Sequence, residues 1–205
     1  GINEFKGKIF HTARWDYDYT GGEWRNPALT KLADKKVAII GTGATAIQVV
    51  PYLARHAGQT YVIQRTPSTI DRRNNQPIDP AWYNSQQPGW QQERIANFHH
   101  AAMERLAPME PDLVVDIWTE ISRNVNAELE AEGWPDISPE EFMRRRTLWD
   151  YRVMERLRGR CDVVNDPATA EALKPYYRYL CKRPASNDDY YPAFNQDNVK
   201  LIDVA

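Results

Sequence analysis

The central stretch of this sequence reads Lys36-Val37-Ala38-Ile39-Ile40-Gly41-Thr42-Gly43-Ala44-Thr45-Ala46-Ile47-Gln48. Four apolar residues, most of them β-branched, run directly into a Gly-x-Gly-x-x-Ala turn. Such a short continuous apolar run is typical of a strand that is buried on both faces of a parallel sheet. A helical pattern follows, with one apolar face formed by Ile47, Val50, Leu53 and Ala54. The stretch therefore predicts a strand, a tight turn and a helix, the opening unit of a Rossmann-type α/β fold.

The small residues of this turn have separate roles in binding a dinucleotide. Gly41 permits the tight turn, and Gly43 lets a pyrophosphate approach the backbone. Ala46 stands where a third glycine often occurs, and it keeps helix and strand close. The pyrophosphate would lie on free N–H groups at the start of the helix. The expected nucleotide contacts in this stretch are Gly41, Thr42, Gly43, Ala44, Thr45, Ala46 and Gln48.

A second apolar run, Tyr61-Val62-Ile63, ends at Gln64-Arg65-Thr66. In dinucleotide-binding folds an acidic residue after this strand accepts the ribose 2′-hydroxyl of NAD, whereas an arginine accommodates the 2′-phosphate of NADP. Here the residue is Arg65, with Thr66 as a further hydroxyl donor. A planar guanidinium suits a phosphate. Arg65 could also be a solvated residue at a strand end, but its place in the motif favours phosphate recognition and predicts NADPH as the cofactor.

Composition sets outer limits on fold and function. The 205 residues carry a formal net charge of −2, which indicates one soluble domain with an embellishment and argues against nucleic acid as a partner. No window has the apolar length of a membrane span, and no signal peptide is visible. The two cysteines, Cys161 and Cys181, form neither a metal spacing nor a disulfide framework, so we expect a cytoplasmic location. Because the chain begins with Gly1 rather than Met, we expect an interior piece of a longer protein.

Residues 1–35 contain a second pattern, Phe-x-Gly-x-x-x-His-x-x-x-Trp-Asp, formed by Phe5, Gly7, His11, Trp15 and Asp16. It resembles the fingerprint of the Baeyer–Villiger monooxygenases, flavin- and NADPH-dependent enzymes that insert an oxygen atom beside a ketone carbonyl. Related N-oxidising monooxygenases end this motif in Phe or Tyr, so the tryptophan favours the Baeyer–Villiger branch. The resemblance implies a linker that couples cofactor binding to domain movement, with no bond-making task for the histidine. A plain linker with local packing is the alternative, and the glycine turn that follows argues against it.

Residues 70–160 interrupt the alternation of strands and helices and predict an inserted helical subdomain. We expect a helix from Trp90 to Leu106, and a second helix in which Val114, Ile117, Trp118, Ile121, Val125 and Leu129 form an apolar stripe. Ser138-Pro139-Glu140-Glu141 predicts the start of a third helix, which should run to about Arg158 and bury Phe142, Trp149 and Val153. The run Arg144-Arg145-Arg146 is interpreted as a solvated helix face. In the family that the chain resembles, such an insertion borders the substrate cavity.

The last part of the chain, residues 161–205, is expected to return to the sheet. Asp166-Pro167 predicts a cap for a short helix over 168–173. Lys182-Arg183-Pro184, followed by paired tyrosines, is the second patch of family resemblance. The resemblance implies that Lys182 helps to hold the 2′-phosphate and that Arg183 is the catalytic residue, a fixed cation beside the peroxide that oxygen forms on reduced flavin. The alternative is a basic turn before a proline.

The resemblance covers nearly the whole chain but only part of such an enzyme. A first Gly-x-Gly-x-x-Gly turn for FAD is missing, so the FAD domain is expected to lie outside this chain. Residues 36–69 and 161–205 are thus predicted to form a Rossmann-type NADP-binding domain, and residues 70–160 its helical insertion. In the intact enzyme NADPH would reduce FAD, and molecular oxygen and a ketone or other small molecule would be the substrates, through a peroxyflavin.

The sequence has three alternative interpretations. An N- or S-oxidising flavin monooxygenase would use the same cofactors on another atom. An isolated NADP-binding module without activity of its own also fits the chain. A plain NADP-dependent reductase predicts a Tyr-x-x-x-Lys pair, but the tyrosines at 52, 61, 83 and 151 are followed four residues later by His, Arg, Gln and Glu.

Overall fold

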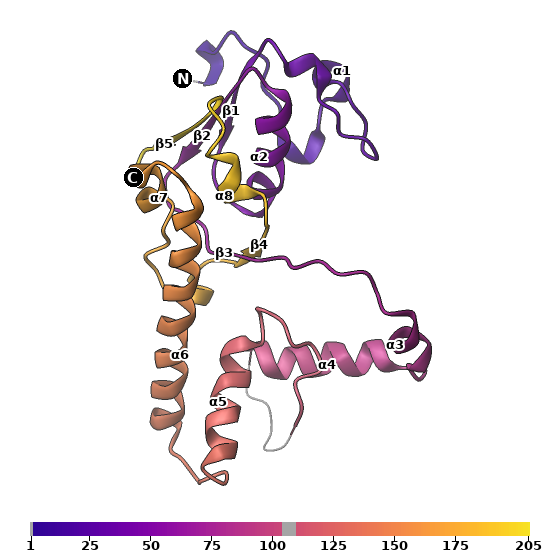
Figure 1. Ribbon diagram of the computed structural model, residues 1–205, viewed down its shortest axis with the longest axis vertical. Helices are drawn as coiled ribbons and strands as arrows, with labels where there is room; N and C mark the ends of the chain where they lie inside the picture. Colours follow the sequence, from indigo (N-terminus) through magenta and orange to yellow (C-terminus); the bar gives the residue numbers. More distant parts are fainter. Residues whose placement is uncertain (1, 104–109) are drawn as a thin grey trace. The chain divides into compact units, whose positions relative to one another are not determined.

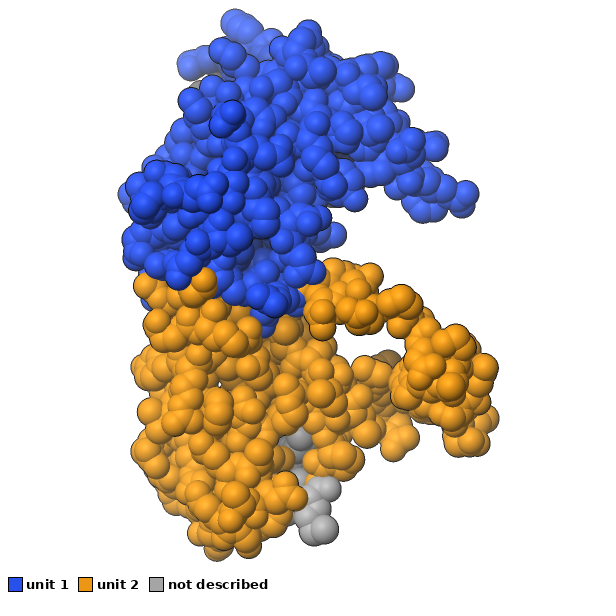
Figure 2. Space-filling view, viewed as in Figure 1, with its two compact units in different colours: residues 1–72, 160–176, 183–205 blue, residues 73–159, 177–182 orange. Residues whose placement is uncertain are grey.

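The computed structural model describes residues 2–103 and 110–205, and the chain forms two compact units (Figures 1 and 2). Unit 1 contains the residues up to 72, residues 160–176 and residues 183–205. Unit 2 contains residues 73–159 and 177–182. Residues 1–35, expected as a separate linker, thus group with the sheet, and residues 177–182, expected with the sheet, group with the helices.

Unit 1 holds the strands and the shorter helices. Its regular elements are η1 (Ile2–Glu4), η2 (Thr12–Arg14), α1 (Tyr17–Thr20), η3 (Thr30–Leu32), β1 (Lys36–Ile40), α2 (Ala44–His56), β2 (Gln59–Gln64), β3 (Ile70–Asp71), η4 (Arg160–Val163), α7 (Pro167–Ala172), β4 (Ala185–Ser186), α8 (Tyr190–Ala193) and β5 (Val199–Asp203). The elements of unit 2 are α3 (Pro80–Ser85), α4 (Trp90–Met103), α5 (Glu120–Ala131), α6 (Pro139–Gly159) and η5 (Tyr179–Cys181). The expected end of the helix at 106 lies outside the described residues.

The main sheet is parallel throughout, with the strand order β1-β2-β5. Ile40 pairs with Ile63, and Ile63 pairs with Ile202, so the carboxyl ends of all three strands meet at one edge. The α/β class with a parallel sheet is therefore confirmed. A second parallel pair joins the two-residue strands β3 and β4.

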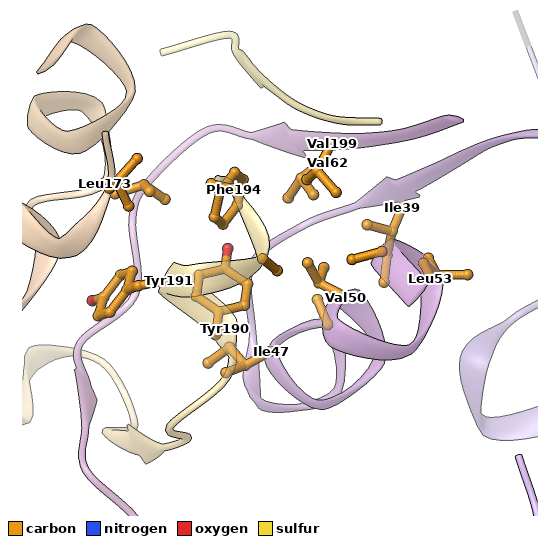
Figure 3. Packing of buried hydrophobic residues seen from close by; sticks show 14 of the residues in the cluster. Ile39, Ile47, Val50, Leu53, Val62, Leu173, Tyr190, Tyr191, Phe194 and Val199 are labelled. Carbon is orange, nitrogen blue, oxygen red and sulfur yellow. The ribbon is translucent and has the colours of Figure 1, made fainter. Parts of the chain in front are cut away.

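The core of unit 1 lies between one face of the sheet and the helices α2 and α8 (Figure 3). Figure 3 shows strand residues Ile39, Val62 and Val199 beside side chains of α2 and of the segment around α8. The buried helical partners are Ile47, Val50, Leu53, Tyr190, Tyr191 and Phe194. Complete burial of an aliphatic side chain stabilises a fold by about 1.5–3 kcal/mol, so this layer holds β1, α2 and β2 together.

The expectation that β1 is buried on both faces is wrong for the part of the chain that the structure describes. Ile39 is buried, but Ile40 on the opposite face is 84% exposed. Ile202 of β5 is 40% exposed on the same side. The reason is that α2 and α8 pack against each other and therefore cover the same face of the sheet.

The core of unit 2 is formed by α5, α6 and η5. Tyr179 is buried there, its hydroxyl donates to the Ile117 carbonyl at 2.7 Å, and its N–H donates to Asp150 Oδ1 at 3.0 Å. These bonds explain why residues 177–182 group with the helices. The other buried members of the cluster are Ile121, Val153, Met154 and Leu157.

The predicted bounds of α6 agree with the structure, but only one of the three side chains expected to be buried is so. The helix begins at Pro139 and ends at Gly159, and the hydroxyl of Ser138 accepts from the Glu141 N–H at 3.2 Å. Val153 is buried, whereas Phe142 and Trp149 are half-buried. The short helix α7 is also confirmed, since Asp166 accepts from the Thr169 N–H at 2.8 Å.

Two expectations about the helices are wrong. The apolar stripe that starts at Val114 becomes helical only at Glu120, because Asp112 accepts from the N–H groups of Val114 and Val115 and folds this segment into turns. The arginine run is not uniformly solvated either. The side chain of Arg145 is only 14% exposed, because it forms ion pairs on both sides.

Among the described residues, no helix combines the length and the apolar character that crossing a bilayer requires.

Candidate nucleotide-binding turn

The glycine turn lies at the carboxyl edge of the parallel sheet, between β1 and α2. Gly41 has φ +100°, a left-handed conformation that favours glycine, and its N–H donates to the Ile63 carbonyl at 2.8 Å. A Cβ atom at Gly41 or Gly43 would find no neighbouring heavy atom within 4 Å. The outer side of the turn is therefore open, as close approach of a pyrophosphate requires.

The start of α2 presents backbone donors to this open side. Gly43 is the N-cap residue, and no side chain caps the helix there. Ala44 and Thr45 are exposed, whereas Ala46 is buried against the core. Because the first N–H groups of a helix have no partner within the helix, they form an anion site with the positive end of the helix dipole.

Thr42 and Thr66, two of the predicted nucleotide contacts, form a hydrogen bond that stabilises the turn. The hydroxyl of buried Thr42 donates to the Thr66 carbonyl at 2.8 Å, and the hydroxyl of Ser68 donates to the Thr42 carbonyl. Gln48 is exposed and donates to the carbonyl of Ala44 at 3.0 Å within its own helix. The Thr42 bond ties the turn to the segment after β2. Sequence reasoning missed Ser68, which belongs to no motif.

That segment carries Arg65, the residue expected to recognise a 2′-phosphate. Arg65 directly follows β2 and is exposed. Its guanidinium forms no hydrogen bond or ion pair with any residue that the structure describes, whereas the carbonyl of the next residue, Thr66, accepts from Thr42. Unit 1 thus brings the open turn, the helix start and one unengaged cation to the same edge of the sheet.

Lys182 and Arg183 belong to different units, although they are adjacent in the chain. Lys182, in unit 2, is half-buried, and its ammonium lies 5.2 Å from the centroid of the Tyr177 ring. Arg183, in unit 1, is exposed, and its side chain forms no hydrogen bond or ion pair with the described residues. The joint contact of Lys182 and Arg65 with one phosphate stays a prediction.

The histidine motif near the start of the chain is held by local contacts. His11 accepts from the Ala13 N–H through Nδ1 at 3.1 Å and so caps η2. The indole of Trp15 donates to the Thr20 hydroxyl at 2.9 Å and meets the Phe10 ring edge-on, with 5.3 Å between ring centroids. These contacts give the motif a defined conformation within unit 1.

The charged and small residues of the same motif also have local partners. Asp16 caps α1 and pairs with Lys8 at 2.7 Å, and this contact lowers the pKa of the Asp16 carboxyl. The ring of exposed Phe5 covers Gly7, where a Cβ atom would lie 2.5 Å from it. An open hollow of about 540 Å³ adjoins the motif. It is lined by Lys8, Ile9, Phe10, Arg14, Trp15, Asp16, Tyr17 and Asp18.

Metal chemistry finds no support in the described part of the chain, where no three His, Cys, Asp or Glu side chains gather as ligands. Cys161 is buried, and burial raises the pKa of its thiol.

The fold and this turn define the chain as a parallel α/β protein with an open glycine turn at the carboxyl edge of its sheet. No protein-family model matches the sequence. Over 204 residues it is 52% identical to a Baeyer-Villiger monooxygenase from Stachybotrys chlorohalonatus, an alignment that covers 99% of this chain and 32% of the relative. Over nearly its whole length the chain is similar to Baeyer–Villiger monooxygenases, and it spans about a third of the length of the curated relatives that it matches.

Solved structures show the same similarity. A polycyclic ketone monooxygenase from Thermothelomyces thermophila superimposes with a TM-score of 0.84 and 41% identity, over 99% of this chain and 33% of that one. The structure of OTEMO in complex with FAD and NADP superimposes with a TM-score of 0.64 and 25% identity, over 100% of this chain and 38% of that one. Relatives of this chain thus bind both cofactors that the sequence predicts.

Proposed function

We propose that this chain is the NADPH-binding part of a flavin-dependent monooxygenase that converts a ketone into an ester or lactone. The observation that carries the proposal is the open Gly41–Gly43 turn with the unengaged Arg65 beside it in unit 1. The overall reaction would consume the ketone, oxygen, NADPH and a proton, and would release the ester, NADP⁺ and water.

The residues of the turn would hold the cofactor without reacting. The N–H groups at the start of α2 would bind the pyrophosphate, and Gly43 leaves it the space. Arg65 would form a charge-assisted contact with the 2′-phosphate, and Lys182 would add a second charge. These contacts would fix the position of the nicotinamide.

FAD, when bound, supplies electron transfer from NADPH to oxygen and delivers the oxygen atom to the substrate. Arg183 would act beside it as a fixed cation, which holds negative charge that develops on the reacting oxygen atoms. Arg183 is exposed and has no partner among the described residues, which suits this task. An arginine that was already ion-paired within the protein would attract the negative charge on the reacting oxygen atoms less strongly.

Exchange of Arg65 tests the cofactor assignment. Titration of the chain with NADPH and with NADH, followed by calorimetry or nicotinamide fluorescence, should show tighter binding of NADPH. Arg65→Ala should weaken NADPH about ten- to a hundredfold, because a hydrogen bond to a charged group contributes about 1.5–3 kcal/mol, and should leave NADH nearly unchanged.

Arg55→Ala is the matched control. Arg55 is an exposed arginine of unit 1 in the last turn of α2, where its Nε donates to the Pro51 carbonyl. This variant should bind both nucleotides as the original chain does. Equal losses of NADPH and NADH in the Arg65 variant would show that Arg65 does not recognise the phosphate.

A further inference from the structure

Arg160 is the first residue of unit 1 after the long helix α6, and its side chain is turned into the protein. Only 14% of that side chain is exposed. One guanidinium nitrogen, Nη1, donates to the Ile70 carbonyl in β3 at 2.7 Å. The other, Nη2, donates to the Asn187 carbonyl just after β4 at 3.2 Å. One side chain therefore binds the backbone of β3 and of the residue that directly follows β4.

Further contacts fix the guanidinium in this place. It lies 5.6 Å from the centroid of the Tyr191 ring, and the Asp188 carboxylate is 3.9 Å away. Tyr191 of α8 is buried in the core. Burial lowers the pKa of Arg160, and the buried carboxylate of Asp71 opposes this shift by favouring the cation. The arginine thus lies against an aromatic face and near negative charge while its two nitrogens donate to β3 and to the residue after β4.

The strands that Arg160 joins are short. β3 and β4 have two residues each, and two backbone bonds flank their parallel pairing: Ala185 N–H to the Thr69 carbonyl at 3.0 Å, and Asn187 N–H to the Asp71 carbonyl at 2.9 Å. So short a pair is weak by itself. Arg160 adds two charge-assisted bonds to the segments that form this pair.

Arg183 lies two residues before β4, connected to it through Pro184. Proline fixes its own φ angle and restricts the residue before it, so the backbone of Arg183 follows the position of β4. We propose that Arg160 is a positioning residue, which fixes β4 against β3 and thereby sets the direction from which Arg183 reaches the reacting atoms. The inference rests on the proposed function of Arg183.

The geometry requires an arginine rather than any cation. The two carbonyls lie on different segments, and the planar fork of a guanidinium reaches both at once, whereas a lysine ammonium at the end of a flexible stem is a single point charge. Arg160→Lys keeps the charge and much of the volume but loses the bridge. This variant separates positioning from simple electrostatics.

The experiment measures ester formed per NADPH consumed, together with hydrogen peroxide, in the complete enzyme. This ratio does not depend on the amount of folded protein, so a purely structural defect leaves it unchanged. Arg183→Ala should lower the ratio about a hundredfold or more. Arg160→Ala and Arg160→Lys should lower it about tenfold, with peroxide as the replacement product, and should change the KM for NADPH less than twofold.

Arg156→Ala is the control. Arg156 lies four residues earlier on α6, pairs at the surface with Glu120 at 2.5 Å, and should leave the ratio unchanged. A double variant, Arg160→Ala with Arg183→Ala, should resemble Arg183→Ala alone, since a positioning residue has no effect once its target is removed.

The outcomes separate the two proposals. If Arg183→Ala keeps the normal ratio, the proposed role of Arg183 is wrong. If Arg183→Ala uncouples the enzyme but both Arg160 variants keep the normal ratio, only the positioning role is wrong. Effects that multiply in the double variant, or a complete failure of both Arg160 variants to fold, would also overturn it.

Discussion

Gly41 and Gly43 occupy the same turn but are glycines for different physical reasons. Gly41 needs the left-handed conformation, with φ +100°, whereas Gly43 has φ −73°, which every residue adopts. At Gly43 the constraint is the open space that a ligand would fill, since a Cβ atom there meets no protein atom within 4 Å. Stability and ligand binding can therefore be separated at neighbouring positions.

Gly43→Ala is expected to change the free energy of unfolding by less than about 1 kcal/mol. The lower entropy of the unfolded chain stabilises it, and alanine is a poorer N-cap than glycine, so the two effects oppose each other. NADPH affinity should nevertheless fall, because the new methyl group takes the place of the pyrophosphate. Chemical denaturation and nucleotide titration of the same preparation measure the two quantities.

Gly41→Ala is the matched comparison, and for it we expect destabilisation of about 1–3 kcal/mol from the left-handed backbone. A Gly43→Ala chain that binds NADPH normally would show that the nucleotide does not approach this turn.

At the scale of elements, α5 and α6 are joined by an ion-pair network. Arg145 forms a bidentate contact with Glu132 at 2.8 and 2.9 Å and also pairs with Glu141 at 2.9 Å. Arg144 binds the second oxygen of Glu141 at 2.7 Å. Single exposed ion pairs contribute little, but a bidentate network of this kind is the arrangement in which they matter.

This network predicts an acid-sensitive unit 2. Its arginines lower the pKa of Glu141 to about 2 and lower that of Glu132 as well. Because the folded carboxylates have the lower pKa values, their stabilisation is present above the ordinary value of 4.5 and is lost as the pH falls through about 2. Thermal unfolding between pH 6 and 2 should therefore show a falling Tm.

Glu132→Gln should reduce this pH dependence, and added salt should weaken it. Glu130→Gln, at an exposed position two residues earlier, serves as the control and should leave the profile unchanged. A Tm profile that is identical in the Glu132 variant would show that the network does not stabilise the helix pair.

At the scale of the whole molecule, we expect NADPH and FAD to bind to different parts of the complete enzyme. The chain contains one glycine fingerprint, at Gly41, and the relatives that it matches are about three times as long. We expect the purified chain to bind NADPH but not FAD, and to form no ester from a ketone.

Visible absorbance and equilibrium dialysis against FAD measure this directly, with NADPH dialysed in parallel as the positive control. A purified chain that retains FAD, and therefore shows the visible absorbance of flavin, would contradict this prediction.

The sequence predicted those features of the fold that depend on neighbouring residues. The apolar run before Gly41 and the Ser138-Pro139 start of α6 are local patterns, and both elements occur where expected. The exposure of Ile40 was not predictable, because it depends on which face α2 and α8 share. The late start of α5 was missed because two N–H groups prefer the carboxylate of Asp112 to a helical carbonyl.

In the candidate site too, local patterns were predictable and tertiary contacts were not. The glycine turn and Arg65 follow from motif spacing, and the structure places them at one edge of the sheet. Arg160 gives no signal in the sequence, since a basic residue after a helix ends is ordinary. Its importance follows only from tertiary contacts with segments 90 and 27 positions away in the chain.

The contact between Arg160 and β3 also bears on how such proteins diversify. The chain departs from unit 1 after Arg72 and first returns to it at Arg160, whose guanidinium donates to the Ile70 carbonyl, so the two ends of segment 73–159 are neighbours. An excursion with neighbouring ends can be lengthened, shortened or exchanged between homologues without displacing the strands that anchor it. For recombination, natural or in the laboratory, this makes the ends of segment 73–159 a junction at which a helical cassette can be grafted while the sheet and its glycine turn are kept intact.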